Sequence, residues 1–97
     1  MNVRFLSLAR AEMDDAFAWY EDQAVGLGYE FLDALDQAVR LITSFPNSHQ
    51  LAGKSLRRCL LNRFPYALYY GIDQGGIIVV AVAHLRRNPH YWVGRVM

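Results

Sequence analysis

Several features that mark other protein classes are scarce or absent in this chain. Its 97 residues contain a single cysteine, Cys59, which excludes an internal disulfide and any metal motif built on paired cysteines. The longest apolar run, IIVVAVA at residues 77–83, is far shorter than the ~20 residues of a membrane-spanning helix. The N-terminal sequence MNVRFLSLARAEMDD has no long apolar region and no small-residue cleavage site, so it does not resemble a signal peptide. We therefore expect a cytoplasmic protein in which Cys59 is a small core residue.

The length and composition predict one folded domain, residues 1–97. A chain of this size buries roughly 60–65% of its unfolded surface, enough for a core of modest stability. The content of 54% hydrophobic and 20% charged residues is typical of a globular protein rather than a disordered one. No internal repeat, glycine-rich phosphate loop, nucleophile elbow or pair of carboxylates stands out. The enzyme classes that carry those motifs are therefore not indicated.

Acidic residues are scarce in the second half of the chain. Up to residue 53 there are three basic residues and eight acidic ones. From Lys54 onward there are seven basic residues and one acid, Asp73. A segregation this strong predicts one acidic and one basic surface in the folded domain, and the basic surface should face an anionic partner.

The first half of the chain has the pattern of a short strand followed by two helices. The sequence VRFL within residues 1–6 alternates as a strand does, and Ser7 is placed to cap the helix that follows. The apolar residues then recur at steps of three and four, at Ala9, Met13, Ala16, Phe17, Tyr20 and Ala24. The acids of this helix lie mostly off that stripe and are interpreted as a solvated face: Glu12, Asp14, Asp15, Glu21 and Asp22.

The sequence GLG at residues 26–28 predicts the end of the first helix, because glycine readily adopts the left-handed conformation of a helix cap. A second helix is predicted over residues 29–44 and is stopped by Pro46. Its inner face is expected to carry Phe31, Leu35, Ala38, Val39 and Ile42. Helices joined by so short a turn form an antiparallel hairpin.

After a linker at residues 47–54 the period of the pattern changes to two. Strands are predicted at residues 55–61, 64–71 and 77–84, and their short connections make them an antiparallel meander. The run IIVVAVA is apolar on both faces, as a central strand covered on each side is. The expected fold is therefore α+β: a short N-terminal strand and a helical hairpin packed on an antiparallel sheet, in the order β-α-α-β-β-β.

The strand RFPYALYYG combines many aromatic residues with nearby arginines. Alternation places Phe64, Tyr66, Leu68 and Tyr70 on one face and Tyr69 on the other. Aromatic core residues are the simpler interpretation, and a stacking surface for nucleic acid is the alternative. The histidines of the C-terminal stretch HLRRNPHYW lack a third metal ligand close in sequence, so we expect neither a metal site nor a cofactor.

Taken together, the helical hairpin broken at GLG, the sequence RFPYALYY and the stretch HLRRNPHYW followed by Arg95 resemble the RelE/ParE superfamily of bacterial toxins. The resemblance covers almost the whole chain. It implies the toxin of a type II toxin–antitoxin (plasmid stabilisation) module, neutralised by an antitoxin whose extended or helical segment wraps it. The RelE branch cleaves messenger RNA on the ribosome, whereas the ParE branch inhibits DNA gyrase. The signature here resembles the ParE branch more closely.

This resemblance implies a binding surface with Arg86, Arg87 and Arg95 outward and Tyr91 and Trp92 packed on the domain. The full set of expected binding residues is Arg57, Arg58, Arg63, Arg86, Arg87, Tyr91, Trp92 and Arg95. Pro89 is expected to pin the segment across the sheet. A gyrase inhibitor needs only a complementary basic and aromatic surface.

An enzyme remains the alternative. A metal-free ribonuclease needs a proton donor and acceptor beside arginine clamps, and the residues that would supply these are Arg58, Arg63, His84, Arg87, His90 and Tyr91. A third interpretation is a degenerate family member that only binds its antitoxin and regulates its operator. The predicted partners are thus an antitoxin together with DNA gyrase or, alternatively, the ribosome and mRNA.

Overall fold

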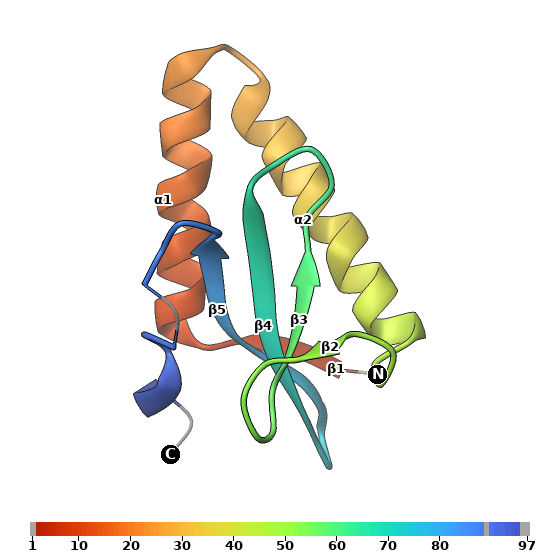
Figure 1. Ribbon diagram of the computed structural model, residues 1–97. Helices are drawn as coiled ribbons and strands as arrows, with labels where there is room; N and C mark the ends of the chain where they lie inside the picture. Colours follow the sequence, from red (N-terminus) through yellow and green to blue (C-terminus); the bar gives the residue numbers. More distant parts are fainter. Residues whose placement is uncertain (1, 89, 96–97) are drawn as a thin grey trace.

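A computed structural model of the protein describes residues 2–88 and 90–95, and it has two helices lying behind one sheet (Figure 1). The elements are β1 (Asn2–Phe5), α1 (Ser7–Gln23), α2 (Leu27–Ser44), β2 (Gln50–Leu51), β3 (Arg57–Leu60), β4 (Tyr66–Asp73), β5 (Gly76–His84) and the 3-10 turn η1 (Val93–Arg95). The predicted α+β order is confirmed. The short strand β2 is an addition, in the segment interpreted from sequence as a linker. The expected contact of Pro89 lies outside the described residues.

The sheet has the strand order β1-β5-β4-β3-β2. Strands β3, β4 and β5 form the predicted antiparallel meander, and β1 pairs in parallel with β5, so the sheet is mixed. A parallel neighbour requires a long connection, which the two helices supply. Strand β5 lies between β1 and β4 and is buried on both faces, as its uniformly apolar sequence predicts.

The turn from β4 into β5 depends on a glycine. Gly76 has a φ of +127° and pairs with Asn2 of β1. A Cβ at this position would clash with the backbone oxygen of Asn2. Glycine is therefore required for β1 to reach the start of β5.

The helical turn differs from the prediction in where its ends lie. Helix α1 ends at Gln23, before the GLG sequence, and Gly26 takes the left-handed conformation with a φ of +89°. Gly28 is already inside α2, where a Cβ would lie 2.7 Å from the carbonyl oxygen of Phe17. The Glu21 carboxylate accepts the N–H groups of Gly26 and Gly28, each at 2.9 Å. Glu21 therefore belongs to the turn rather than to a solvated face.

Two further details of α1 differ from the prediction. Ser7 is the first residue of the helix rather than its cap: Leu6 holds the cap position and no side chain hydrogen-bonds there. Ala24, expected on the inner stripe, is exposed because the helix has ended before it. None of the helices among the described residues is long and apolar enough to cross a membrane.

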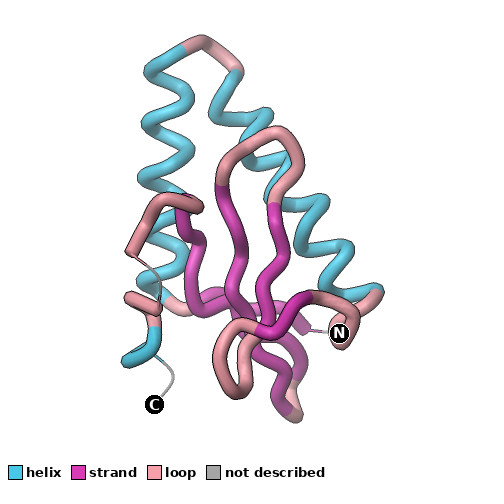
Figure 2. The backbone as a smooth tube through the Cα atoms, viewed as in Figure 1, coloured by secondary structure: helices cyan, strands magenta, loops and turns pink. Residues whose placement is uncertain are grey.

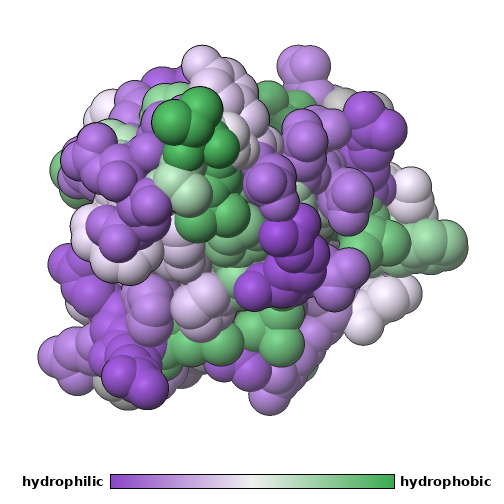
Figure 3. Space-filling model, turned by 90° about the horizontal axis from the view of Figure 1, so that it is seen from above, coloured by the Kyte–Doolittle hydropathy of each residue, from purple (hydrophilic) through white to green (hydrophobic). Residues whose placement is uncertain are grey.

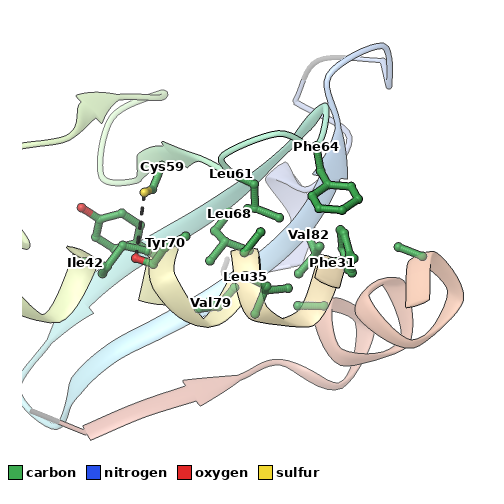
Figure 4. Close-up of a cluster of buried hydrophobic side chains, with 14 of the residues drawn as sticks. Phe31, Leu35, Ile42, Cys59, Leu61, Phe64, Leu68, Tyr70, Val79 and Val82 are labelled. Carbon is green, nitrogen blue, oxygen red and sulfur yellow. Dashed lines mark hydrogen bonds between the residues drawn. The ribbon is translucent and has the colours of Figure 1, made fainter. Parts of the chain in front are cut away.

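The helices cover one face of the sheet, which we call the helix-covered face. Figure 4 shows Phe31, Leu35 and Ile42 of α2 lying against Leu68 and Tyr70 of β4. The Phe31 ring meets the rings of three other aromatic residues, with centroids 5.2–5.5 Å apart. Cys59 is buried in this core, as predicted.

The opposite face of the sheet carries a much smaller buried cluster, made of Leu56, Val80, Ala81 and Trp92. Tyr69 points to this face, as the alternation predicts, and its ring centroid lies 4.9 Å from that of Trp92. Figure 2 shows the chain leaving β5 and running as loop and one short turn beside that strand. The packing of Trp92 against the domain is therefore confirmed.

Candidate functional site

A cavity of about 360 Å³ opens on the opposite face, where β5 ends. We call it the arginine cavity. It is lined by Arg58, Tyr69, Ala83, His84, Leu85, Arg86, Arg87, Asn88, Tyr91 and Trp92. Six of the residues expected from sequence meet here, and no aspartate or glutamate is among the described residues that line the cavity. This arrangement favours an anionic ligand or protein surface.

A second hollow of about 250 Å³ adjoins the arginine cavity and shares Arg58, Tyr69 and Trp92 with it. Its remaining wall includes β2 and His90. The Arg58 guanidinium donates a hydrogen bond to Gln50 Oε1 at 2.9 Å. His90 lines this neighbouring hollow; its ring centroid lies 5.4 Å from that of Trp92, and its backbone has a left-handed φ of 67°.

Two of the expected arginines lie elsewhere. Arg57 pairs with Tyr70 across the sheet and donates to the carbonyl oxygen of His49 at 2.7 Å, which ties down the loop before β2. Arg63 lies in the turn between β3 and β4 and forms an ion pair with Glu30 at 2.8 Å. Neither residue lines the arginine cavity.

Arg95 points inward, against the expectation that it faces out. Both of its terminal nitrogens donate to the Glu12 carboxylate, at 2.9 and 3.0 Å, and the two side chains are only 13% and 15% exposed. Glu12 also accepts the Tyr91 hydroxyl at 2.7 Å and the Val82 N–H at 3.0 Å. Glu12 is thus the centre of a partly buried network and not part of a solvated face.

The electrostatics of Glu12 follow from these partners. Burial alone would raise the pKa of this carboxyl. The hydrogen bonds from Arg95, Tyr91 and the Val82 N–H, with the positive charge of Arg95, hold the pKa below its usual value. The sequence did contain a signal, since Glu12 falls between Ala9 and Ala16 at the steps of three and four that define the buried stripe.

Tyr91 lies between two arginines. The Arg87 guanidinium is 4.0 Å from the centre of its ring and that of Arg95 is 4.9 Å away. Burial and the hydrogen bond to Glu12 together raise the pKa of the Tyr91 phenol. Arg87 itself is half exposed at the cavity, with one nitrogen 3.9 Å from Glu12.

The sequence matches the family described as "ParE toxin of type II toxin-antitoxin system, parDE" over residues 3–89. The chain belongs to this family. A solved structure titled "Chromosomal ParDE TA system from P. aeruginosa" is similar in fold, with a TM-score of 0.63 and 16% sequence identity. The similarity covers 87% of this chain and 95% of that one. No curated protein sequence matches significantly.

In this ParE family member, two of the groups suited to proton transfer have other hydrogen-bonding partners. The Tyr91 hydroxyl is directed to Glu12, and the His84 Nδ1 accepts the Arg86 N–H at 3.0 Å. The His84 ring lies edge-on to Tyr66, with centroids 5.1 Å apart. Among residues 2–88 and 90–95, no three His, Cys, Asp or Glu side chains come together in a way that could hold a metal ion.

Proposed function

We propose that the protein is a toxin that binds and inhibits DNA gyrase and is neutralised by a cognate antitoxin. The observation that supports this is the composition of the arginine cavity. Arg58, Arg86 and Arg87 surround aromatic side chains, without a carboxylate among the described lining residues. Arginine, tyrosine and tryptophan are the residue types enriched where one protein binds another tightly.

The same cavity is less suited to RNA cleavage, the alternative function. General acid–base catalysis needs a group with a pKa near the working pH and a free path to the reacting atom. The raised pKa of the Tyr91 phenol and its bond to Glu12 remove one such group. Arg63, another residue of the expected ribonuclease set, is engaged with Glu30 away from the cavity. We therefore favour a binding surface over an enzyme.

The decisive experiment is supercoiling by purified gyrase in the presence of the purified protein, alongside cleavage of ribosome-bound message. We expect supercoiling to be inhibited and the message to stay intact. The double variant His84→Asn, His90→Gln removes both imidazoles near the cavity while keeping polar side chains of similar size. It should retain inhibition within about tenfold, whereas loss of a true acid–base group typically costs 10²- to 10⁴-fold in rate. Message cleavage without gyrase inhibition would replace our proposal by the ribonuclease one.

A second surface supports the antitoxin part of the proposal. A groove of about 430 Å³ runs between α2 and β3, lined by Ala34, Gln37, Ala38, Leu41, Leu60, Leu61 and Asn62. Leu41 and Leu60 are each about half exposed beside it. Strand β2 pairs only with Arg57 and Arg58, so β3 continues past its end. An antitoxin segment with apolar anchors and acidic residues would suit this groove and the arginines of β3, Arg57 and Arg58. It could bind as an added strand or as a helix.

Apolar residues on the surface seen from above the α1–α2 turn are interrupted by polar ones. Figure 3 looks down on the end of the molecule that carries the α1–α2 turn, where hydrophobic patches alternate with hydrophilic side chains.

Because Leu60 lines the proposed antitoxin groove, Leu60→Asp should weaken antitoxin binding without unfolding the protein or changing gyrase inhibition. Leu8→Asp, a change at an equally exposed leucine of α1, is the control. Association should also slow as salt is raised, because opposite charges steer the encounter; a rate independent of salt, or equal losses in both variants, would contradict the assignment.

A further inference from the structure

Strand β5 is only partly covered by β1. The parallel pairing runs from Asn2↔Gly76 to Phe5↔Val79, and the Leu6 N–H then donates to the Val79 carbonyl oxygen at 2.9 Å. There the chain turns into α1, and no strand pairs with the rest of this edge among the described residues. The later backbone groups of β5 must therefore find other partners.

A pair of side chains supplies those partners. The Val82 N–H donates to Glu12 Oε1 at 3.0 Å, and the Val80 carbonyl oxygen accepts Arg95 Nη1 at 2.9 Å. Glu12 and Arg95 are also bonded to each other through both carboxylate oxygens. This ion pair thus takes the place of a neighbouring strand along the second half of β5. Charged groups this well hydrogen-bonded hold a defined geometry.

The same pair fastens the C-terminal segment, residues 85–88 and 90–95. Leu85 still has a backbone hydrogen bond to Pro65. Arg86 and Arg87 bond back to the adjacent His84 through their N–H groups. Beyond these, the hydrogen bonds that join the described part of this segment to the rest of the molecule come from Tyr91 and Arg95 and end on Glu12 or Val80. Trp92 adds its apolar contact. Glu12 is therefore the main polar anchor of the segment.

Through Tyr91 the anchor reaches the arginine cavity. The Tyr91 hydroxyl is fixed by Glu12, and Arg87 lies over the Tyr91 ring at 4.0 Å. Since Arg87 and Tyr91 both line the cavity, a shift of the segment would move two of its walls. Glu12 itself does not line the arginine cavity and affects it only through Tyr91 and Arg87.

We propose that Glu12 is a positioning residue of the toxin: by holding the C-terminal segment on the second half of β5, its carboxylate sets where Arg87 and Tyr91 lie in the arginine cavity. This inference rests on the proposed function in one respect, that the cavity is the surface by which the toxin acts. The docking of the segment by Glu12 does not depend on which target is bound.

The test uses Glu12→Gln, which keeps the size of the side chain and removes its charge. Trp19→Phe serves as the common background, because it leaves Trp92 as the sole tryptophan and so makes indole fluorescence a reporter of the segment. Glu30→Gln is the matched control, since it breaks an ion pair of the same kind, Arg63–Glu30, that is exposed and away from the cavity. Arg95→Lys keeps the positive charge but loses the two-pronged contact.

Four measurements are made on each variant: thermal unfolding, acrylamide quenching of Trp92, growth arrest on expression, and gyrase supercoiling. For Glu12→Gln we expect cooperative unfolding, stronger quenching, loss of growth arrest, and roughly a tenfold rise in the concentration needed for inhibition, the size of a coupling within one hydrogen-bonded network. Glu30→Gln should match the background protein in all four. In all four measurements Arg95→Lys should change in the same direction as Glu12→Gln, but by a smaller amount. This variant provides the test if Glu12→Gln does not fold.

The outcomes separate the two proposals. If the background protein arrests growth without inhibiting gyrase, the gyrase function is wrong, while the growth arrest of Glu12→Gln still tests positioning. A folded Glu12→Gln with unchanged quenching overturns the anchoring role. Stronger quenching with unchanged growth arrest overturns the link between the segment and toxicity.

Discussion

The two faces of the sheet are held by different means. On the helix-covered face, fifteen of the described residues form one buried cluster shared by α1, α2, the strands β3, β4 and β5, and the turn between β3 and β4. On the opposite face the buried cluster among the described residues is Leu56, Val80, Ala81 and Trp92, and a polar network joins the C-terminal segment to α1. Many apolar contacts therefore secure one face, whereas a few specific side chains secure the other.

This difference should separate effects on stability from effects on the proposed binding surface. In a large apolar cluster many residues contribute to the free energy of folding, so the polar residues around the cluster contribute little to stability. The opposite face uses few buried residues and leaves arginines half exposed around a cavity. Changes on the first face should act on folding, and changes on the second on the position and use of the binding surface.

The largest effect is expected from Phe31→Ala. Phe31 is fully buried at the centre of the helix-covered core. Truncating such a residue typically costs about 3–5 kcal/mol, a large part of the ~5–15 kcal/mol of a domain. We expect loss of cooperative unfolding, or a midpoint in urea shifted close to zero. A mild shift in the chemical denaturation curve would mean that this face is less cooperative than its packing indicates.

Trp92→Ala should cost less, about 3 kcal/mol, because the cluster around it is smaller. Circular dichroism should retain the helical signal while the melting temperature falls. Trp19→Ala is the control: Trp19 is 58% exposed, and such a surface change is usually worth no more than about 0.5 kcal/mol. Equal losses in the two variants would mean that Trp92 does not close this face.

Acid should weaken the opposite face first. Because the folded-state pKa of Glu12 is lowered, its contribution is present above the unfolded pKa and is lost as the pH falls through the folded value. The melting temperature of the native protein should therefore drop more steeply than that of Glu12→Gln as the pH falls below about 5. Each 1 kcal/mol lost corresponds to roughly 4–8 °C in a domain of this size. Parallel curves for the two proteins would contradict a stabilising Glu12 carboxylate.

The smallest effect on stability is expected from Arg87→Ala. Its side chain is 54% exposed, and its contact with the Tyr91 ring is worth less than about 1 kcal/mol at such a site. Growth arrest should nevertheless be lost, because Arg87 forms part of the proposed binding surface. Arg40→Ala, in an exposed ion pair of α2, is the matched control and should leave toxicity intact. Retained toxicity in Arg87→Ala would remove this residue from the surface.

The fold was largely predictable because apolar periodicity reports local structure directly. Helix spacing located α1 and α2, and the run at residues 77–83 identified the central strand. The parallel β1–β5 pair and the two-residue β2 leave no local pattern, since pairing partners far apart in the chain are not marked in either sequence. The candidate site, too, was predictable where its residues are close in sequence and unpredictable where they are far apart. The arginine cavity gathers neighbours within HLRRNPHYW, whereas the inward turn of Arg95 depends on Glu12, a residue read as part of a solvated face.

The Glu12 network also bears on the order in which the molecule assembles. Its three hydrogen-bonded partners lie 70, 79 and 83 positions away along the chain. Contacts between such distant residues carry a high cost in loop closure and are made late in folding, after the local hairpin and meander. An interaction absent from the transition state changes the rate of unfolding and leaves the rate of folding nearly the same. The network should therefore slow unfolding and so determine how long the native state persists once it has formed.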